Sequence, residues 1–200
     1  MSDEEGHVEK MKKLQKEHRK KQKETHDPER GLVLVHTGNG KGKSSSAFGV
    51  IARALGWGQR VAVVQFIKGK WVTGERQFFS KLDGAVDWFT MGDGFTWDTQ
   101  DKAADTEAAR LAFERGREML SSGDYDLVVL DEINIALRYD YLSAEYVKAG
   151  LEARHQRTSV ILTGRDAPEL LCDYADLVSE MREIKHPYKA GIRAQRGIDF

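Results

Sequence analysis

Short apolar, β-branched runs alternate with amphipathic stretches along most of the chain. The runs cover residues 31–37, 61–67, 85–91, 126–132, 159–164 and, more weakly, 176–181. Near-continuous apolar runs of this length are typical of strands covered on both faces, as in a parallel sheet. Residues 43–58 and 105–123 space their apolar side chains as helices do, and Ser143 is a candidate N-cap for a third helix. The alternation predicts one doubly wound α/β domain, with a mostly parallel sheet and helices on both faces.

The first 28 residues lack this pattern. Residues 10–23 carry eight Lys and Arg against one Glu, and Val8, Met11 and Leu14 are among the few apolar side chains nearby. Such a segment cannot bury itself in a core. We interpret residues 1–28 as a basic, flexible N-terminal arm and residues 29–200 as the folded domain. The arm is a solvated tail, folds over an anionic ligand or a neighbouring subunit, or binds nucleic acid.

Composition narrows the class of protein. The chain has 200 residues, 40% of them hydrophobic, which suits one domain with a real core. No window approaches the roughly 18 apolar residues of a membrane span, and the N-terminus lacks the apolar centre of a secretory signal. We therefore expect a cytoplasmic protein with no membrane partner. A net charge of −1 gives no reason to expect nucleic acid. With Cys172 as the single cysteine, an internal disulfide and a cysteine-based metal site are excluded.

The first predicted strand runs into a glycine-rich loop, TGNGKGKSS, that a helix follows at once. Its residues, all candidates for nucleotide contact, are Thr37, Gly38, Asn39, Gly40, Lys41, Gly42, Lys43, Ser44 and Ser45. Strand, glycine loop and helix are the context of the phosphate-binding P-loop, although Thr37 occupies the position of its first glycine. Lys43 would bind phosphates, Ser44 would bind Mg²⁺, and Lys41 adds a cation. The alternative is a glycine-rich turn with incidental lysines.

Other strand ends add candidates, because ligands of such folds bind beyond the carboxyl ends of the strands. Asp131 and Glu132 follow the apolar run LVVL and would hold Mg²⁺ or Mn²⁺. Lys68 follows the second strand, and it either binds the ligand or simply lies where the strand ends. Arg165 follows the fifth strand and would contact phosphates or lie on the surface. These features predict a P-loop protein that binds ATP or GTP, and leave kinase, ATPase and motor open.

Residues 92–98, GDGFTWD, place Phe95 and Trp97 in a stretch otherwise made of small and polar residues. Strict alternation would put both rings on one side of a strand, where they would pack into the core. The other interpretation is that they contact a ligand.

Seven motifs, taken in chain order, carry a resemblance to a known family. They are TGNGKGKSSSAFG, VVQFIKGKW, GDGFTWDTQ, VVLDEI, YDYL, TGR and KHPYKAGIRAQRGIDF. Together they resemble the ATP:corrinoid adenosyltransferases over residues 31–200, including the incomplete first glycine of the loop. The resemblance implies a P-loop NTPase-like (RecA-like) fold and transfer of the 5′-deoxyadenosyl group of ATP to the Co(I) centre of a corrinoid, with release of triphosphate. The substrate would be cob(I)alamin or a precursor such as cob(I)yrinic acid a,c-diamide.

The resemblance also implies roles for particular residues. Lys41 and Lys43 would stabilise the departing triphosphate, and Phe95 and Trp97 would lie against the lower face of the corrinoid and exclude its axial ligand. A flavoprotein would then suffice as the reductant of cobalt. The family resemblance further implies a homodimer whose N-terminal arm folds across the active site. Two competitors stay open: a P-loop ATPase or kinase acting with a protein or nucleic-acid partner, and a nucleotide-dependent corrinoid carrier.

Overall fold

A computed structural model of the chain describes residues 3–27, 29–66, 73–82, 84–90 and 101–199. The chain divides into two compact units, Met1–Arg30 and Gly31–Phe200. No helix in these ranges is long and apolar enough to cross a membrane.

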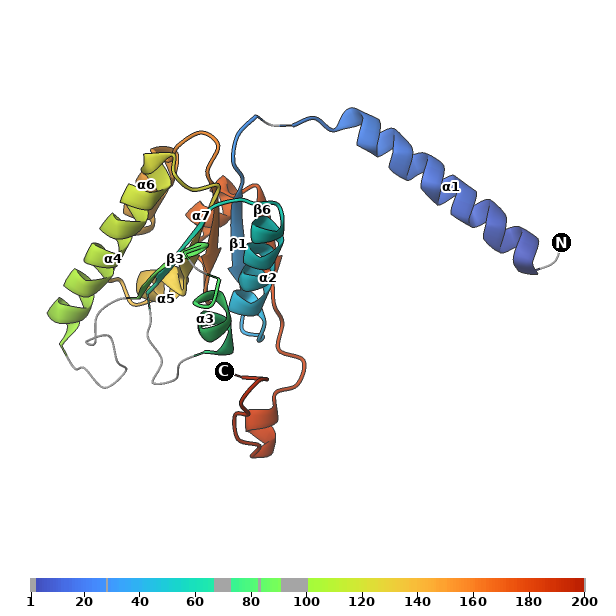
Figure 1. The fold of residues 1–200 in the computed structure, drawn as a ribbon. Helices are drawn as coiled ribbons and strands as arrows, with labels where there is room; N and C mark the ends of the chain where they lie inside the picture. The colour runs from blue at the N-terminus through green and yellow to red at the C-terminus, as the bar shows by residue number, and fades with distance from the viewer. Residues whose placement is uncertain (1–2, 28, 67–72, 83, 91–100, 200) are drawn as a thin grey trace. The chain divides into compact units, whose positions relative to one another are not determined.

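In its described residues, the N-terminal unit contains one helix, α1 (Asp3–Glu24) (Figure 1). The side chains of α1 are exposed from residue 6 onward. The sequence analysis interpreted this segment as a basic, flexible arm and did not identify the helix. The helix has a local explanation, because Lys, Glu, Gln, Leu and Met are all good helix formers. Glu9 and Glu17 each precede a lysine by four residues, and Lys21 and Lys23 lie in the last turn, where cations favour the helix dipole.

The second unit is built on a six-stranded sheet in the order β3-β2-β4-β5-β1-β6. Its strands are β1 (Val33–Thr37), β2 (Val61–Gln65), β3 (Val86–Thr90), β4 (Leu127–Asp131), β5 (Ser159–Thr163) and β6 (Leu177–Glu180). Each neighbouring pair is parallel. The six predicted strands and the parallel sheet are confirmed.

The helices of this unit differ in how well the sequence predicts them. They are α2 (Lys43–Gly56), α3 (Gly74–Phe79), α4 (Lys102–Ser122), α5 (Ile133–Arg138), α6 (Ala144–Glu152), α7 (Glu169–Tyr174) and a 3₁₀ turn, η1 (Pro187–Ala190). The predicted helices are α2, α4 and α6; Gly123 ends α4 in the left-handed conformation, and the Ser143 side chain caps α6. The six-residue helices α3, α5 and α7 were missed, because a turn and a half does not display a helical period.

Helices cover both faces of the sheet, as predicted (Figure 1). Alternate residues of β2 point to opposite faces: Ala62 and Val64 belong to the core beneath α4, α6 and α7, whereas Val61 and Val63 belong to the core beneath α2 and α3. Because all strands are parallel, their carboxyl ends lie along one edge of the sheet. The loops that follow those ends form the candidate site.

Candidate functional site

The glycine-rich loop joins the end of β1 to the start of α2 and lies against the chain that follows β6. Gly38 and Gly42 have φ of +96° and +116°, a region that favours glycine. A Cβ atom on Gly40 would lie 2.8 Å from backbone carbons of Met181 and Arg182, and the Gly40 amide donates to the Met181 carbonyl at 2.7 Å. The loop therefore requires glycine both for its conformation and for this close backbone contact.

The two lysines of the loop have different surroundings. Lys43 is buried, and its Nζ donates to the carbonyl oxygen of Gly40 at 2.7 Å. Burial lowers the pKa of the Lys43 ammonium, and the nearby Glu132 carboxylate opposes that shift. Lys41 is half exposed and forms an ion pair with Asp199 near the end of the chain. The loop thus carries one buried and one exposed cation.

Asp131, the last residue of β4, is buried and fully hydrogen-bonded. Its Oδ1 accepts from the Thr163 hydroxyl at 2.8 Å, and its Oδ2 accepts from Gln65 Nε2 at 3.2 Å. The sheet register explains the second contact, because Gln65 pairs with Asp131 across β2 and β4. Burial raises the pKa of Asp131, while hydrogen bonds from Ser44, Thr163 and Gln65 act in the opposite direction.

Glu132 follows in the left-handed conformation, with φ of 62°, which is uncommon for a residue other than glycine. Its backbone N–H donates to the same Thr163 hydroxyl at 2.8 Å. Burial, then the charge of Asp131, raises the pKa of Glu132 to about 7, against the opposing charges of Lys43 and Arg165. The buried Asp131 and the partly exposed Glu132 are thus adjacent at a strained turn, as is common at functional sites.

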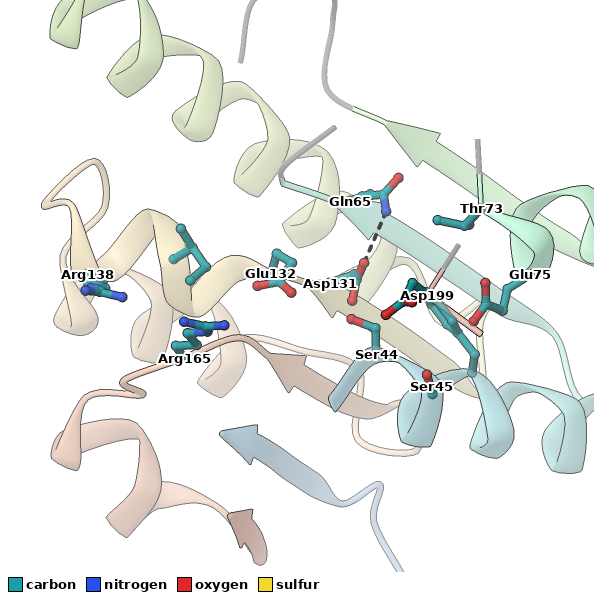
Figure 2. Close-up of a pocket in the computed structure, with 12 residues that line it drawn as sticks. Ser44, Ser45, Gln65, Thr73, Glu75, Asp131, Glu132, Arg138, Arg165 and Asp199 are labelled. Carbon is teal, nitrogen blue, oxygen red and sulfur yellow. Dashed lines mark hydrogen bonds between the residues drawn. The ribbon is translucent and has the colours of Figure 1, made fainter. Parts of the chain in front are cut away.

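Asp131 and Glu132 line a pocket of about 510 Å³. Figure 2 shows Ser44 and Asp131 facing each other, with Glu132 and Arg165 farther along the pocket. The lining residues are Ser44, Ser45, Phe48, Gln65, Thr73, Glu75, Asp131, Glu132, Ile135, Arg138, Arg165 and Asp199. The structure therefore brings together five residues singled out from the sequence: Ser44, Ser45, Asp131, Glu132 and Arg165.

Five polar lining residues were missed by the sequence analysis: Gln65, Thr73, Glu75, Arg138 and Asp199. Gln65 ends a buried strand, so the rule that selected Asp131 would also have selected it. The others carry no comparable local signal, because the packing of α3, α5 and the C-terminal segment brings them to the pocket. Arg138 also pairs with Asp166 at 3.2 Å.

The remaining candidates lie elsewhere. The Thr37 hydroxyl accepts from the backbone N–H of Ala167 at 3.0 Å, which ties the start of the loop to the segment after β5. Asn39 is exposed at the turn of the loop. Lys68, Phe95 and Trp97 lie outside the described residues.

The donor set of the pocket suits a hard cation such as Mg²⁺ or Mn²⁺. Ser44, Asp131 and Glu132 offer only oxygen atoms, which are the ligands that such cations prefer. Within the described ranges, no set of three His, Cys, Asp or Glu side chains is grouped so that it could hold a metal.

Comparisons with known proteins identify one family of relatives. Residues 29–200 match the family model of the ATP:corrinoid adenosyltransferases BtuR/CobO/CobP. A corrinoid adenosyltransferase of Pseudomonas aeruginosa is 51% identical over 172 residues, which covers 86% of this chain and 85% of that protein. One from Sinorhizobium sp. is 48% identical over 200 residues and covers 99% and 93%, so that match extends into the N-terminal unit.

Solved structures give a likeness of fold alone. The crystal structure of the RadB recombinase has a TM-score of 0.51 at 15% identity and covers 78% of this chain and 77% of that one. The predicted P-loop NTPase-like (RecA-like) fold is thereby confirmed.

Proposed function

The chain belongs to the ATP:corrinoid adenosyltransferase family, and from that premise we propose that the described pocket binds the triphosphate of ATP during adenosyl transfer. In this reaction the Co(I) centre of the corrinoid supplies the electron pair of a new bond to C5′ of the ribose. The bond from C5′ to oxygen breaks, and triphosphate leaves with that electron pair. The proposal is carried by one observation: Ser44 and Ser45, which directly follow the glycine-rich loop, line the same pocket as the adjacent acids Asp131 and Glu132.

The loop supplies most of what a departing triphosphate requires. Lys43 is already oriented toward the loop backbone, Lys41 adds a second cation, and the N-terminus of α2 directs its N–H groups at the anion. These groups are fixed before the reaction, so little reorganisation is required as charge develops on the leaving group. Ser44, Asp131 and Glu132 would hold the divalent cation. When bound, that cation would neutralise further phosphate charge.

A nucleophile as strong as Co(I) requires no general base, so the enzyme's contribution is orientation and exclusion of water. We assign that part to Phe95 and Trp97, which would lie against the corrinoid and deny cobalt an axial donor. Reduction of Co(II) by a flavoprotein would then be sufficient. Arg165 lines the pocket after the end of β5, and Lys68 follows β2 in the sequence; we assign both to phosphate contact.

Anaerobic assay of the purified protein with MgATP and chemically reduced cob(I)alamin tests the function. The expected result is loss of the Co(I) absorbance, a light-sensitive product, and triphosphate released in proportion to the corrinoid consumed. Accumulation of ADP whether or not corrinoid is present would instead identify an ATPase. A homodimer is part of the same proposal, and light scattering of the purified protein measures it directly.

A further inference from the structure

The C-terminal segment, residues 182–199, follows β6 and runs past the phosphate loop. Every residue from 187 to 198 is exposed, and Ile184, Tyr188 and Ile198 are 88%, 79% and 79% exposed. Exposed apolar side chains of this size contribute no packing against the domain. Burial therefore does not hold the segment in place.

Asp199 differs from the exposed run 187–198 that precedes it. Its side chain is only 11% exposed, its carboxylate forms the ion pair with Lys41, and its Oδ2 accepts from the backbone N–H of Gln195 at 2.8 Å. Within the described part of the chain, the pair with Lys41 is the one hydrogen bond or ion pair that joins residues 182–199 to the rest of the domain. The hydrogen bond from Lys41 lowers the pKa of Asp199, which keeps the carboxylate charged.

Asp199 also adds negative charge where a triphosphate would enter. Asp199 lines the pocket together with Ser44, Glu75 and Asp131, as labelled in Figure 2. With Glu132, four acidic side chains then line the pocket. A triphosphate that reaches the loop would be repelled by the Asp199 carboxylate. It would also bind the Lys41 ammonium group, which Asp199 already occupies. Two anions that compete for one cation weaken each other's binding by the same factor.

We propose that Asp199 is a substrate-site residue that occupies Lys41 until the triphosphate of ATP replaces it, so that ATP binding releases residues 182–199 from the phosphate loop. The inference rests on the proposed function, because it requires triphosphate to bind at this loop. No covalent step is involved, since one ion pair is exchanged for another. ATP binding and the detachment of residues 182–199 from the phosphate loop would therefore occur together.

Binding of ATP and of inorganic tripolyphosphate to Asp199→Asn, measured by titration calorimetry, tests the competition. Asparagine keeps an acceptor for the Gln195 N–H and removes the charge. Because exposed ion pairs are weak, we expect a dissociation constant about two- to fivefold lower than that of the wild type. The matched control is Asp124→Asn, an exposed acid at the opposite edge of the sheet, for which we expect no change. Unchanged or weaker binding by Asp199→Asn would overturn the proposal.

Limited trypsin digestion followed by mass spectrometry tests the release. Cleavage after Lys185, Lys189 and Arg193 is expected to accelerate when ATP or tripolyphosphate is added to the wild type, and to be fast without ligand in Asp199→Asn. Ligand that slows this cleavage would contradict the proposal. A wild type that binds neither anion would contradict the proposed function and this inference together, whereas one that binds both without an effect of Asp199→Asn would contradict the inference alone.

Discussion

Thr163 lies at the end of β5, where one hydroxyl group contacts both acidic residues of the pocket. It donates to Asp131 Oδ1 and accepts from the backbone N–H of Glu132, and its side chain is fully buried. Removing it would leave a buried carboxylate oxygen short of a partner, which costs about 1–3 kcal/mol, and would take away the acceptor of the part-buried Glu132 N–H. Thr163 therefore fixes the orientation of the acidic pair.

We expect Thr163→Val, which keeps the shape and removes the hydroxyl, to lower the free energy of unfolding by about 1–3 kcal/mol. Its kcat/KM for MgATP should fall by about tenfold or more if misplaced carboxylates weaken transition-state contacts. Thr163→Ser restores the hydroxyl and should recover most of both losses. Urea denaturation and steady-state kinetics measure the two effects. Equal values for the valine variant and the wild type would show that the hydroxyl does not orient the acids.

Phe95 and Trp97 lie outside the described residues, so their role is tested by function alone. We expect Phe95→Ala and Trp97→Ala to retain ATP binding and to lose most turnover when a flavin must reduce Co(II). Turnover should be largely retained when Co(I) is supplied by a chemical reductant, because the defect lies in reduction. Normal turnover with the flavin would show that the two rings are not required for reduction of Co(II), and would favour a role in packing.

His36, which lies beside the phosphate loop, is expected to make the free energy of unfolding depend on pH. It is buried beneath the loop with Nδ1 3.3 Å from the Lys43 carbonyl oxygen, and burial lowers its pKa below the ordinary value of 6.5. Below that value the unfolded chain binds a proton that the folded protein does not, so stability falls as the pH decreases. We expect the loss of unfolding free energy between about pH 7.5 and about pH 5.5 to be smaller in His36→Gln than in the wild type. An equal loss would exclude His36, and His26→Gln, at an exposed position, is the control.

The phosphate loop owes its shape to the chain beside it as well as to its own residues. A methyl group on Gly40 would strike the backbone of Met181 and Arg182, neither of which can rotate away. We therefore expect Gly40→Ala to move the loop and to weaken ATP binding by about tenfold or more, as misplaced phosphate contacts do.

Gly49→Ala in α2 is the matched control for that variant. A Cβ atom there meets nothing within 4 Å, and alanine in a helix is about 0.5–1 kcal/mol more favourable than glycine. Calorimetric titration with ATP and thermal unfolding distinguish the two variants. If Gly40→Ala bound ATP as Gly49→Ala does, the close approach to residues 181–182 would not shape the site.

Individual strands and motifs could be predicted from local sequence, but their order in the sheet could not. Apolar runs indicate six strands, and the loop and the acidic pair each follow one of them. Sheet order depends on long-range packing, and β5 lies between β1 and β4, so Thr163 reaches the acids of a neighbouring strand. Asp199 was missed for the same reason, because 158 residues separate it from Lys41. The α1 helix was also missed, but here the cause is local: its residues have strong helix propensity, and the sequence analysis considered only their lack of core-forming side chains.

At the scale of the whole molecule, the chain consists of two units, Met1–Arg30 and Gly31–Phe200. No described side chain of α1 from residue 6 to 24 is buried. We expect deletion of residues 1–27 to leave the unfolding temperature of the domain unchanged. Because the arm is basic and we propose that it folds across the active site, the same deletion should weaken corrinoid binding and slow turnover.

Equilibrium titration with a corrinoid, steady-state rates and thermal unfolding of the truncated protein separate these effects. A variant that replaces Lys12, Lys13 and Lys16 by glutamine keeps the length of the arm and removes part of its charge, so it tests charge apart from coverage. Truncation that lowers the unfolding temperature would show that the arm packs on the domain. Truncation that changes neither corrinoid affinity nor rate would leave α1 a solvated helix, and adenosyl transfer would then depend on residues 29–200 alone.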